Sequence, residues 1–134
     1  VEPRAPFIAF APDSLNDGLL TVRELLDDPN LRLRADLVIL SACQTGLGMP
    51  GDEGMDGLQR AFLMRGARSV IYSLWSVSDE ATRLFMEGFY GHWLDDPDHP
   101  GKSEALRRTR ADLRRIPRFR APHFWAAFQL IGAD

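Results

Sequence analysis

One cysteine, Cys43, is the residue of this chain best suited to covalent chemistry. It follows an apolar run of strand length and opens a glycine-rich stretch, and the small residues Ser41 and Ala42 precede it. A thiol at such a strand end is partly exposed. Because the thiolate is the nucleophile, a base or a positive charge must lower the thiol pKa from about 8.5. The alternative is a buried and inert cysteine, which is the commonest state of a lone one.

Two apolar runs, Leu37–Leu40 and Ser69–Leu74, read as strands covered on both faces. They alternate with helical patterns, which predicts an α/β fold with parallel strands joined by crossover helices. Binding sites in such sheets lie at the carboxyl ends of the strands. Cys43 follows the first run, and Trp75 and Asp79 follow the second, so the sequence points to one edge of the sheet as the site.

The remaining elements complete this reading. Phe7–Phe10 and 124–131 are predicted strands, with turn chemistry at 16–18. Thr21 and Glu24 have the spacing of a capping box, which predicts a helix that ends near Pro29. Three further helices are expected: one from Met55 to Gly66, one capped by Ser78 and broken at 95–100, and one around 105–113.

Composition restricts the function. The 134 residues are 45% hydrophobic and 26% charged with a net charge of −3, as in an ordinary soluble domain. An acidic balance argues against a general binder of nucleic acid or anionic membranes, and no apolar run has the roughly 20 residues that cross a bilayer. A single cysteine forms no internal disulfide, which favours the reducing cytoplasm. No signal peptide is visible, and no cluster of ligands suggests a metal or another cofactor.

Several motifs together resemble the CHAT domain, a caspase-like family often fused to tetratricopeptide repeats. Residues 40–48, Leu-Ser-Ala-Cys-Gln-Thr-Gly-Leu-Gly, are similar to its nucleophile motif. The resemblance continues, in the family's order, through segments 17–21, 51–54, 58–62, 66–70, 73–77, 79–82, 102–108 and 124–132. Each segment alone is weakly specific, but the series covers essentially the whole chain. The stretch from Cys43 to Asp79 is also similar to separase.

The resemblance implies a caspase-like, three-layer αβα sandwich with a mostly parallel sheet. It also implies a cysteine endopeptidase that needs no cofactor and uses a histidine–cysteine dyad. The family places the histidine on the strand before the cysteine strand, usually followed by glycine, and this chain begins just after that point. We therefore expect residues 1–134 to be the C-terminal portion of a single CHAT domain, completed by an upstream half that carries the dyad histidine. A tetratricopeptide-repeat region is the other expected partner.

Four residues are candidates for substrate contact beside the catalytic Cys43. The resemblance to separase implies that Asp79 forms an acidic wall for a basic P1 side chain, but an acid in a first helical turn is also favoured by the helix dipole. Trp75 lines the substrate groove or packs in the core. Asp52 and Glu53 contact substrate or lie in a solvated loop.

None of the histidines present, His92, His99 and His123, replaces the missing base convincingly. His123 precedes the last predicted strand, where the family tends to place a structural histidine. Two functions therefore remain open. One is a peptidase acting on protein substrates, and the alternative is a catalytically inactive caspase-like scaffold that binds partner proteins.

Overall fold

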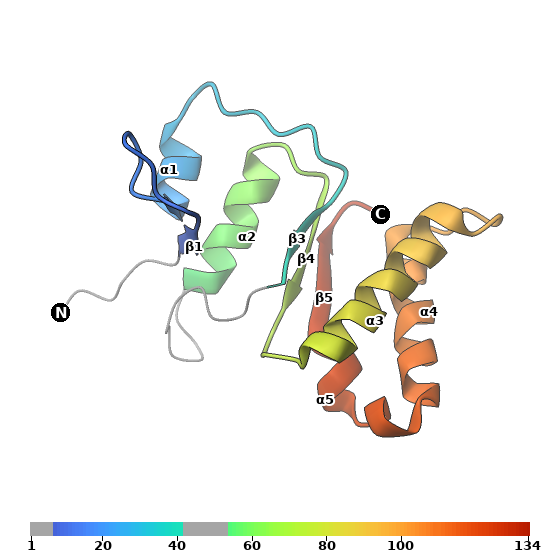
Figure 1. Cartoon of the computed structure of the whole chain (residues 1–134). Coiled ribbons are helices and arrows are strands. Elements are labelled where there is room, and N and C mark those ends of the chain that lie inside the picture. The colour runs from blue at the N-terminus through green and yellow to red at the C-terminus, as the bar shows by residue number, and fades with distance from the viewer. Residues whose placement is uncertain (1–6, 42–53) are drawn as a thin grey trace. The chain divides into compact units, whose positions relative to one another are not determined.

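The computed structural model describes residues 7–41 and 54–134, and it divides the chain into two units (Figure 1). The first unit comprises residues 1–72 and 131–133, and the second comprises residues 73–130 and 134. The structure is of the α/β class. Its described part contains five α-helices and two small sheets. The three-layer sandwich stays a prediction.

The first unit begins with a β-hairpin. Strands β1 (Phe7–Ala9) and β2 (Leu19–Thr21) pair antiparallel, with Ile8 opposite Leu20. A mostly parallel sheet was predicted from the sequence, and β2 was not predicted. The short connection explains the difference, because a parallel pair needs a crossover of a dozen residues or more, whereas neighbouring strands joined by a loop form a hairpin.

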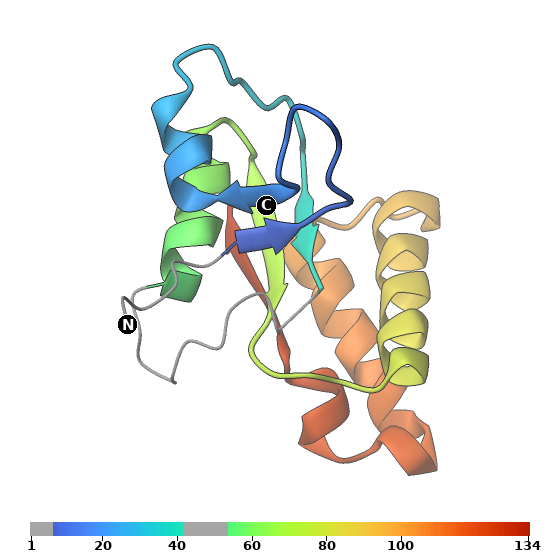
Figure 2. The same ribbon diagram turned by 60° about the vertical axis from the view of Figure 1, so that its left-hand side comes forward.

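Two helices follow in this unit, and Figure 2 shows them beside the hairpin. Helix α1 (Val22–Asp27) begins with the predicted capping box: the Thr21 hydroxyl accepts from the Glu24 N–H at 3.2 Å, and the Glu24 carboxylate accepts from the Thr21 N–H at 2.8 Å. Helix α2 (Gly54–Met64) ends before Gly66, as predicted. Gly66 has φ +109°, and a Cβ there would stand 2.5 Å from the Leu33 carbonyl oxygen, so only glycine fits.

The second sheet has the order β3-β4-β5. Strands β3 (Val38–Leu40) and β4 (Ser69–Ser73) are parallel, with Ile39 opposite Ile71, which confirms both predicted strands. Val38 and Leu40 of β3 pack against the first unit's core, to which β4 contributes. This core is formed by buried side chains of α1, α2 and β4 and the turn between the last two: Leu25, Leu58, Ala61, Phe62, Ala67 and Val70.

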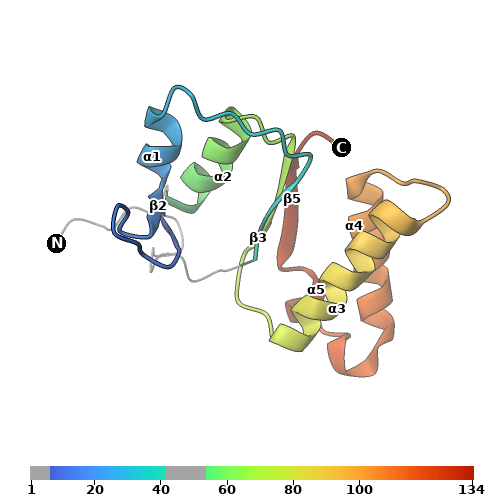
Figure 3. The ribbon, with the colours of Figure 1, turned by 45° about the horizontal axis from the view of Figure 1, so that its top comes forward.

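The second unit is mainly helical (Figure 3). Helix α3 (Asp79–Tyr90) is capped by the predicted Ser78 and continues as a π-helical turn, η1 (Gly91–Asp95), before the predicted break. Helix α4 (Lys102–Arg115) packs against α3. The two helices come close at Gly88, where a Cβ would stand 3.3 Å from the Thr109 methyl group.

The last predicted strand is partly wrong. Residues 122–125 form a short helix, α5 (Pro122–Trp125), after a 3-10 turn η2 (Pro117–Phe119), and strand β5 covers Phe128–Gly132. Proline at the first helical position and the bond from the Ala126 N–H to the Pro122 carbonyl (2.8 Å) explain the helix. Phe128 is buried in the second unit and stacks on Phe85, with 4.0 Å between the ring centroids.

Candidate active site

The parallel pairing of β3 and β4 supplies the frame of the predicted site. Leu40 lies opposite Tyr72, so the two strands end at the same edge of the sheet. Ser41 is the last described residue after β3. The proposed nucleophile Cys43 lies outside the described residues, as do Asp52 and Glu53. The roles assigned to these three residues stay predictions.

Trp75 follows β4 and is held by several contacts. Its indole Nε1 donates to the His123 carbonyl oxygen at 2.8 Å, and its ring stacks on the His123 imidazole with 6.1 Å between centroids and 21° between planes. The Ser73 hydroxyl donates to the Trp75 carbonyl oxygen at 2.6 Å. The side chain is still 37% exposed. Trp75 is thus fixed in orientation and accessible, which a wall residue of a groove must be.

Asp79 is the first residue of α3, and its side chain is exposed. The Ser78 hydroxyl accepts from the Ala81 N–H at 3.4 Å, so the cap of this helix is Ser78 itself. The neighbouring Glu80 pairs with Arg118. Two acids in a first helical turn are favoured by the dipole. The helix-dipole interpretation of Asp79 therefore fits its place, and that place also leaves the carboxylate open to solvent.

The three histidines have different surroundings. His92 places Nε2 2.7 Å from the Asp112 carboxylate and Nδ1 3.8 Å from that of Asp96. His99 lies in the loop before α4 with φ +45°. His123 is held against Trp75, as described above. His92 is thus joined to α4, which sequence reasoning missed, since Asp112 reads only as one polar residue on an amphipathic helix.

Comparison with known proteins identifies the chain. The family model of the CHAT domain matches residues 1–133. This chain belongs to the CHAT domain family. Its curated relatives include the mouse protein named tetratricopeptide repeat protein 28, which is 37% identical over 120 residues. The human protein of the same name is 35% identical over 120 residues. In each case the match covers 90% of this chain but only 5% of the relative, so the chain spans a small part of the curated relatives' length.

Most of the side chains with shifted pKa values in the described part of this CHAT domain lie on α4. Hydrogen bonds from Arg107 and Arg108 hold the pKa of Glu104 down to about 2. Arg108 also binds the Asp96 carboxylate at 2.8 Å. Arg107 is exposed to solvent, whereas Arg110 is half-buried. Burial lowers the pKa of Arg110, and its guanidinium donates to the Phe128 carbonyl oxygen.

Among residues 7–41 and 54–134, no group of three or more histidine, cysteine, aspartate or glutamate side chains is arranged to hold a metal ion. None of the described helices of this CHAT domain is long and apolar enough to span a bilayer.

Proposed function

We propose that this CHAT domain is a cysteine endopeptidase module that cleaves protein substrates, with Cys43 as nucleophile. The observation that carries the proposal is the parallel β3–β4 pair in a chain of this family, since Cys43 follows the end of one strand and Trp75 and Asp79 follow the end of the other. The carboxyl edge of parallel strands is where α/β folds bind ligands.

The proposed mechanism begins with proton transfer from the Cys43 thiol to a histidine on a strand upstream of Val1. The thiolate attacks the scissile carbonyl carbon, and the histidinium then donates its proton to the leaving amine. Backbone N–H groups, including that of Cys43, stabilise the oxyanion. Water hydrolyses the resulting thioester and regenerates the thiol.

We also propose that Asp79 selects an arginine or lysine at P1 and that Trp75 lines the groove next to it. Asp52 and Glu53 are proposed as further contacts to substrate. Solvent exposure supports the roles of Asp79 and Trp75, because Asp79 is exposed and Trp75 is partly exposed. The names of the relatives support a tetratricopeptide-repeat region as the associated partner.

Cleavage of a peptide panel by the complete domain tests this proposal. Asp79→Asn should lower kcat/KM for substrates with basic P1 residues by roughly tenfold, as expected for one charge-assisted hydrogen bond at a partly exposed position. Glu80→Gln is the matched control, because Glu80 lies next in the helix and pairs with Arg118. Cys43→Ala should abolish cleavage. An equal loss of kcat/KM for all P1 residues would mean that Asp79 does not select P1 and only stabilises the start of α3 through the helix dipole.

The second candidate is the inactive scaffold, which the tetratricopeptide-repeat relatives favour because such repeats commonly bind proteins. No cleavage by a complete domain that lacks an upstream histidine selects the scaffold, whereas cleavage that survives Cys43→Ala would show that Cys43 is not the nucleophile. In the scaffold case, partner binding should be unaffected by Cys43→Ala.

A further inference from the structure

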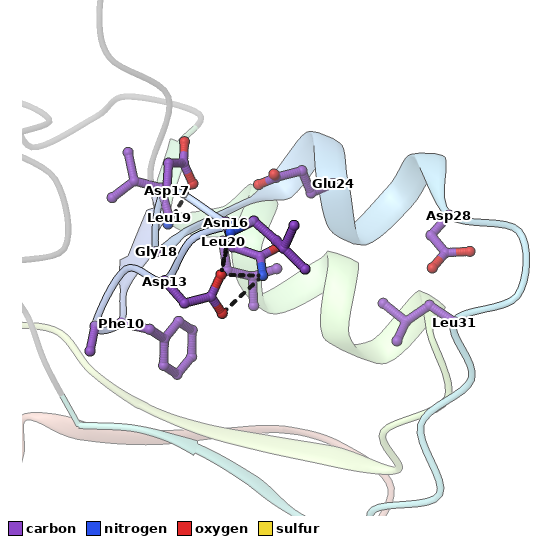
Figure 4. Close-up of a pocket in the computed structure, with 12 residues that line it drawn as sticks. Phe10, Asp13, Asn16, Asp17, Gly18, Leu19, Leu20, Glu24, Asp28 and Leu31 are labelled. Atoms are coloured by element: carbon purple, nitrogen blue, oxygen red, sulfur yellow. Dashed lines mark hydrogen bonds between the residues drawn. The ribbon is translucent and has the colours of Figure 1, made fainter.

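A groove opens in the first unit between the β1–β2 hairpin loop and the chain around the end of α1, with a volume of about 810 Å³ (Figure 4). Its apolar lining includes Phe10, Leu19, Leu20 and Leu31. Phe10 is 61% exposed and Leu19 is 40% exposed. Apolar side chains gathered in a hollow are typical of a surface that a partner covers.

The charges of this groove all have one sign. Its charged lining residues are Asp13, Asp17, Glu24 and Asp28, and no lysine or arginine lines it. Hydrogen bonds from the Leu15 N–H and from Asn16 keep the pKa of Asp13 below its usual value, so this carboxylate is ionised at neutral pH. Within the described part of the chain, none of the four makes an ion pair. The groove therefore combines apolar walls with an uncompensated negative charge.

Local structure does not explain the charge of Asp28. Glu24 belongs to the capping box in the first turn of α1, where the dipole favours an acid, whereas Asp28 lies at the other end of the helix. Glu24 and Asp28 are four residues apart along α1, and like charges at that spacing repel. Asp28 also caps the C-terminal end of the helix, where the dipole disfavours an anion. The Asp28 carboxylate accepts from the Asn30 N–H at 2.8 Å, and an asparagine oxygen would do the same. Glutamine would likewise serve in the capping box at position 24.

We propose that this groove binds a peptide segment of a partner protein that carries arginine or lysine beside an apolar residue. The aliphatic stem of the basic side chain packs on Leu20 and Leu31, and its cationic head lies beside the Asp28 carboxylate, with Glu24 adding negative charge from the other end of α1. The apolar neighbour covers Phe10. Charge complementarity selects a cationic occupant, and the exposed apolar wall selects a peptide, since an isolated small cation would leave that wall in water. The proposal is independent of the catalytic one.

Two pools of fluorescent hexapeptides test it against the full-length protein. One pool has arginine fixed at the third position with equimolar Ala, Leu, Phe and Ser elsewhere, and the other has citrulline, which keeps the shape and removes the charge. We expect the arginine pool to bind at least tenfold more tightly than the citrulline pool. The preference should shrink as salt is raised, because the pairing is partly exposed.

Glu24→Gln and Asp28→Asn are the decisive variants, because each keeps its local hydrogen bond and loses only the charge. Together they should weaken binding of the arginine pool at least tenfold. Asp27→Asn is the matched control, since Asp27 lies on the same helix and pairs with Arg23 at 3.4 Å; it should change binding less than twofold.

Three results would overturn the proposal. Equal binding of the two pools would show that the groove recognises apolar side chains and not the positive charge. Equal losses of affinity in the test and control variants would show that binding depends on the net charge of the protein and not on Glu24 and Asp28. No binding of either pool at millimolar concentration would mean that the groove is not a peptide site.

Discussion

Asp134 takes the place of a helix cap that α4 lacks. The N-cap residue of α4 is Gly101, which has no side chain, and the Asp134 carboxylate accepts from the Ser103 N–H at 2.8 Å and from the Ser103 hydroxyl at 2.6 Å. A Cβ on Gly101 would stand 2.6 Å from this carboxylate. The glycine and the aspartate are therefore a matched pair, and the chain beyond β5 is tied to the start of a helix far away in sequence.

Asp134→Ala should lower the free energy of unfolding by about 1 kcal/mol, the usual effect of losing a side-chain cap. Ser103 lowers the pKa of Asp134, so the contribution is present above the unfolded pKa and is lost as the pH falls through the folded value. Urea unfolding at pH 7 and at pH 3 measures both effects. Asp98→Ala, in the loop before α4, is the control, and an equal loss in that variant would argue against a specific cap.

Glu104 anchors a network of charges that joins α4 to the end of α3. It accepts from Arg107 at 2.6 Å and from Arg108 at 2.9 Å, and Arg108 continues to Asp96, which lies near His92. All five groups are on the two consecutive helical segments η1 and α4 or on the turn between them. The arrangement fixes how the chain turns from one helix into the next.

Acid should loosen this turn as Glu104 becomes protonated. Its folded pKa of about 2 lies below the unfolded value, so its stabilising effect is complete above that unfolded value and is lost as the pH falls toward 2. Amide hydrogen exchange over residues 96–108 between pH 5 and pH 2.5 measures the opening. Glu104→Gln should flatten this pH dependence, and Glu87→Gln, which removes the exposed Arg83 pair, should not.

Sequence reasoning succeeded at this scale where one local rule decided the outcome. The capping box at Thr21 and the cap at Ser78 depend on side chains within three residues of each other, β3 is apolar throughout, and β4 has Val70 and Ile71 at its centre. It failed where a nearby proline and a local hydrogen bond override an apolar composition. Residues 124–127 are apolar enough for a strand, but Pro122 and the bond between Trp125 and the Arg120 carbonyl make a helix there.

The candidate site was predictable only in outline. The order of strands placed Trp75 and Asp79 after β4, but nothing in the sequence showed that His123 would stack on Trp75. Those residues are far apart along the chain, and their contact depends on the packing of α5. The groove beside α1 was missed for a similar reason, because it is formed by a hairpin loop and a helix end whose residues read separately as ordinary turns.

At the scale of the whole molecule, β3 lies at one edge of the described sheet and β5 at the other. Val38 and Leu40 pack against the first unit's core, and the strand has no second neighbour among the described residues. An apolar edge strand tends to pair with another chain. This agrees with the proposal that the chain is the C-terminal portion of a CHAT domain whose upstream half covers that edge.

The 134 residues expressed alone should therefore self-associate and should not cleave peptides. Without the upstream half, the thiol lacks its base and the β3 edge stays open. Size-exclusion chromatography with light scattering, and peptide hydrolysis, measure the two outcomes. Co-expression with the upstream segment should restore a monomer-sized assembly. Cys43-dependent cleavage by the isolated chain would place a base within it and make His123 the first candidate.

The rate at which iodoacetamide alkylates Cys43 in the complete domain, followed from pH 5 to pH 10, tests the central claim most directly. Cys43 is the only cysteine of this chain, so mass spectrometry of the peptide that contains it reports the reaction without ambiguity. We predict a thiol pKa well below 8.5 and, at pH 7, faster alkylation than a cysteine in a short unstructured peptide, because a neighbouring base favours the thiolate. Replacing the upstream histidine with alanine should move the pKa back toward 8.5. A rate that follows an ordinary thiol at every pH, unchanged by the histidine substitution, would contradict the assignment of Cys43 as an activated nucleophile.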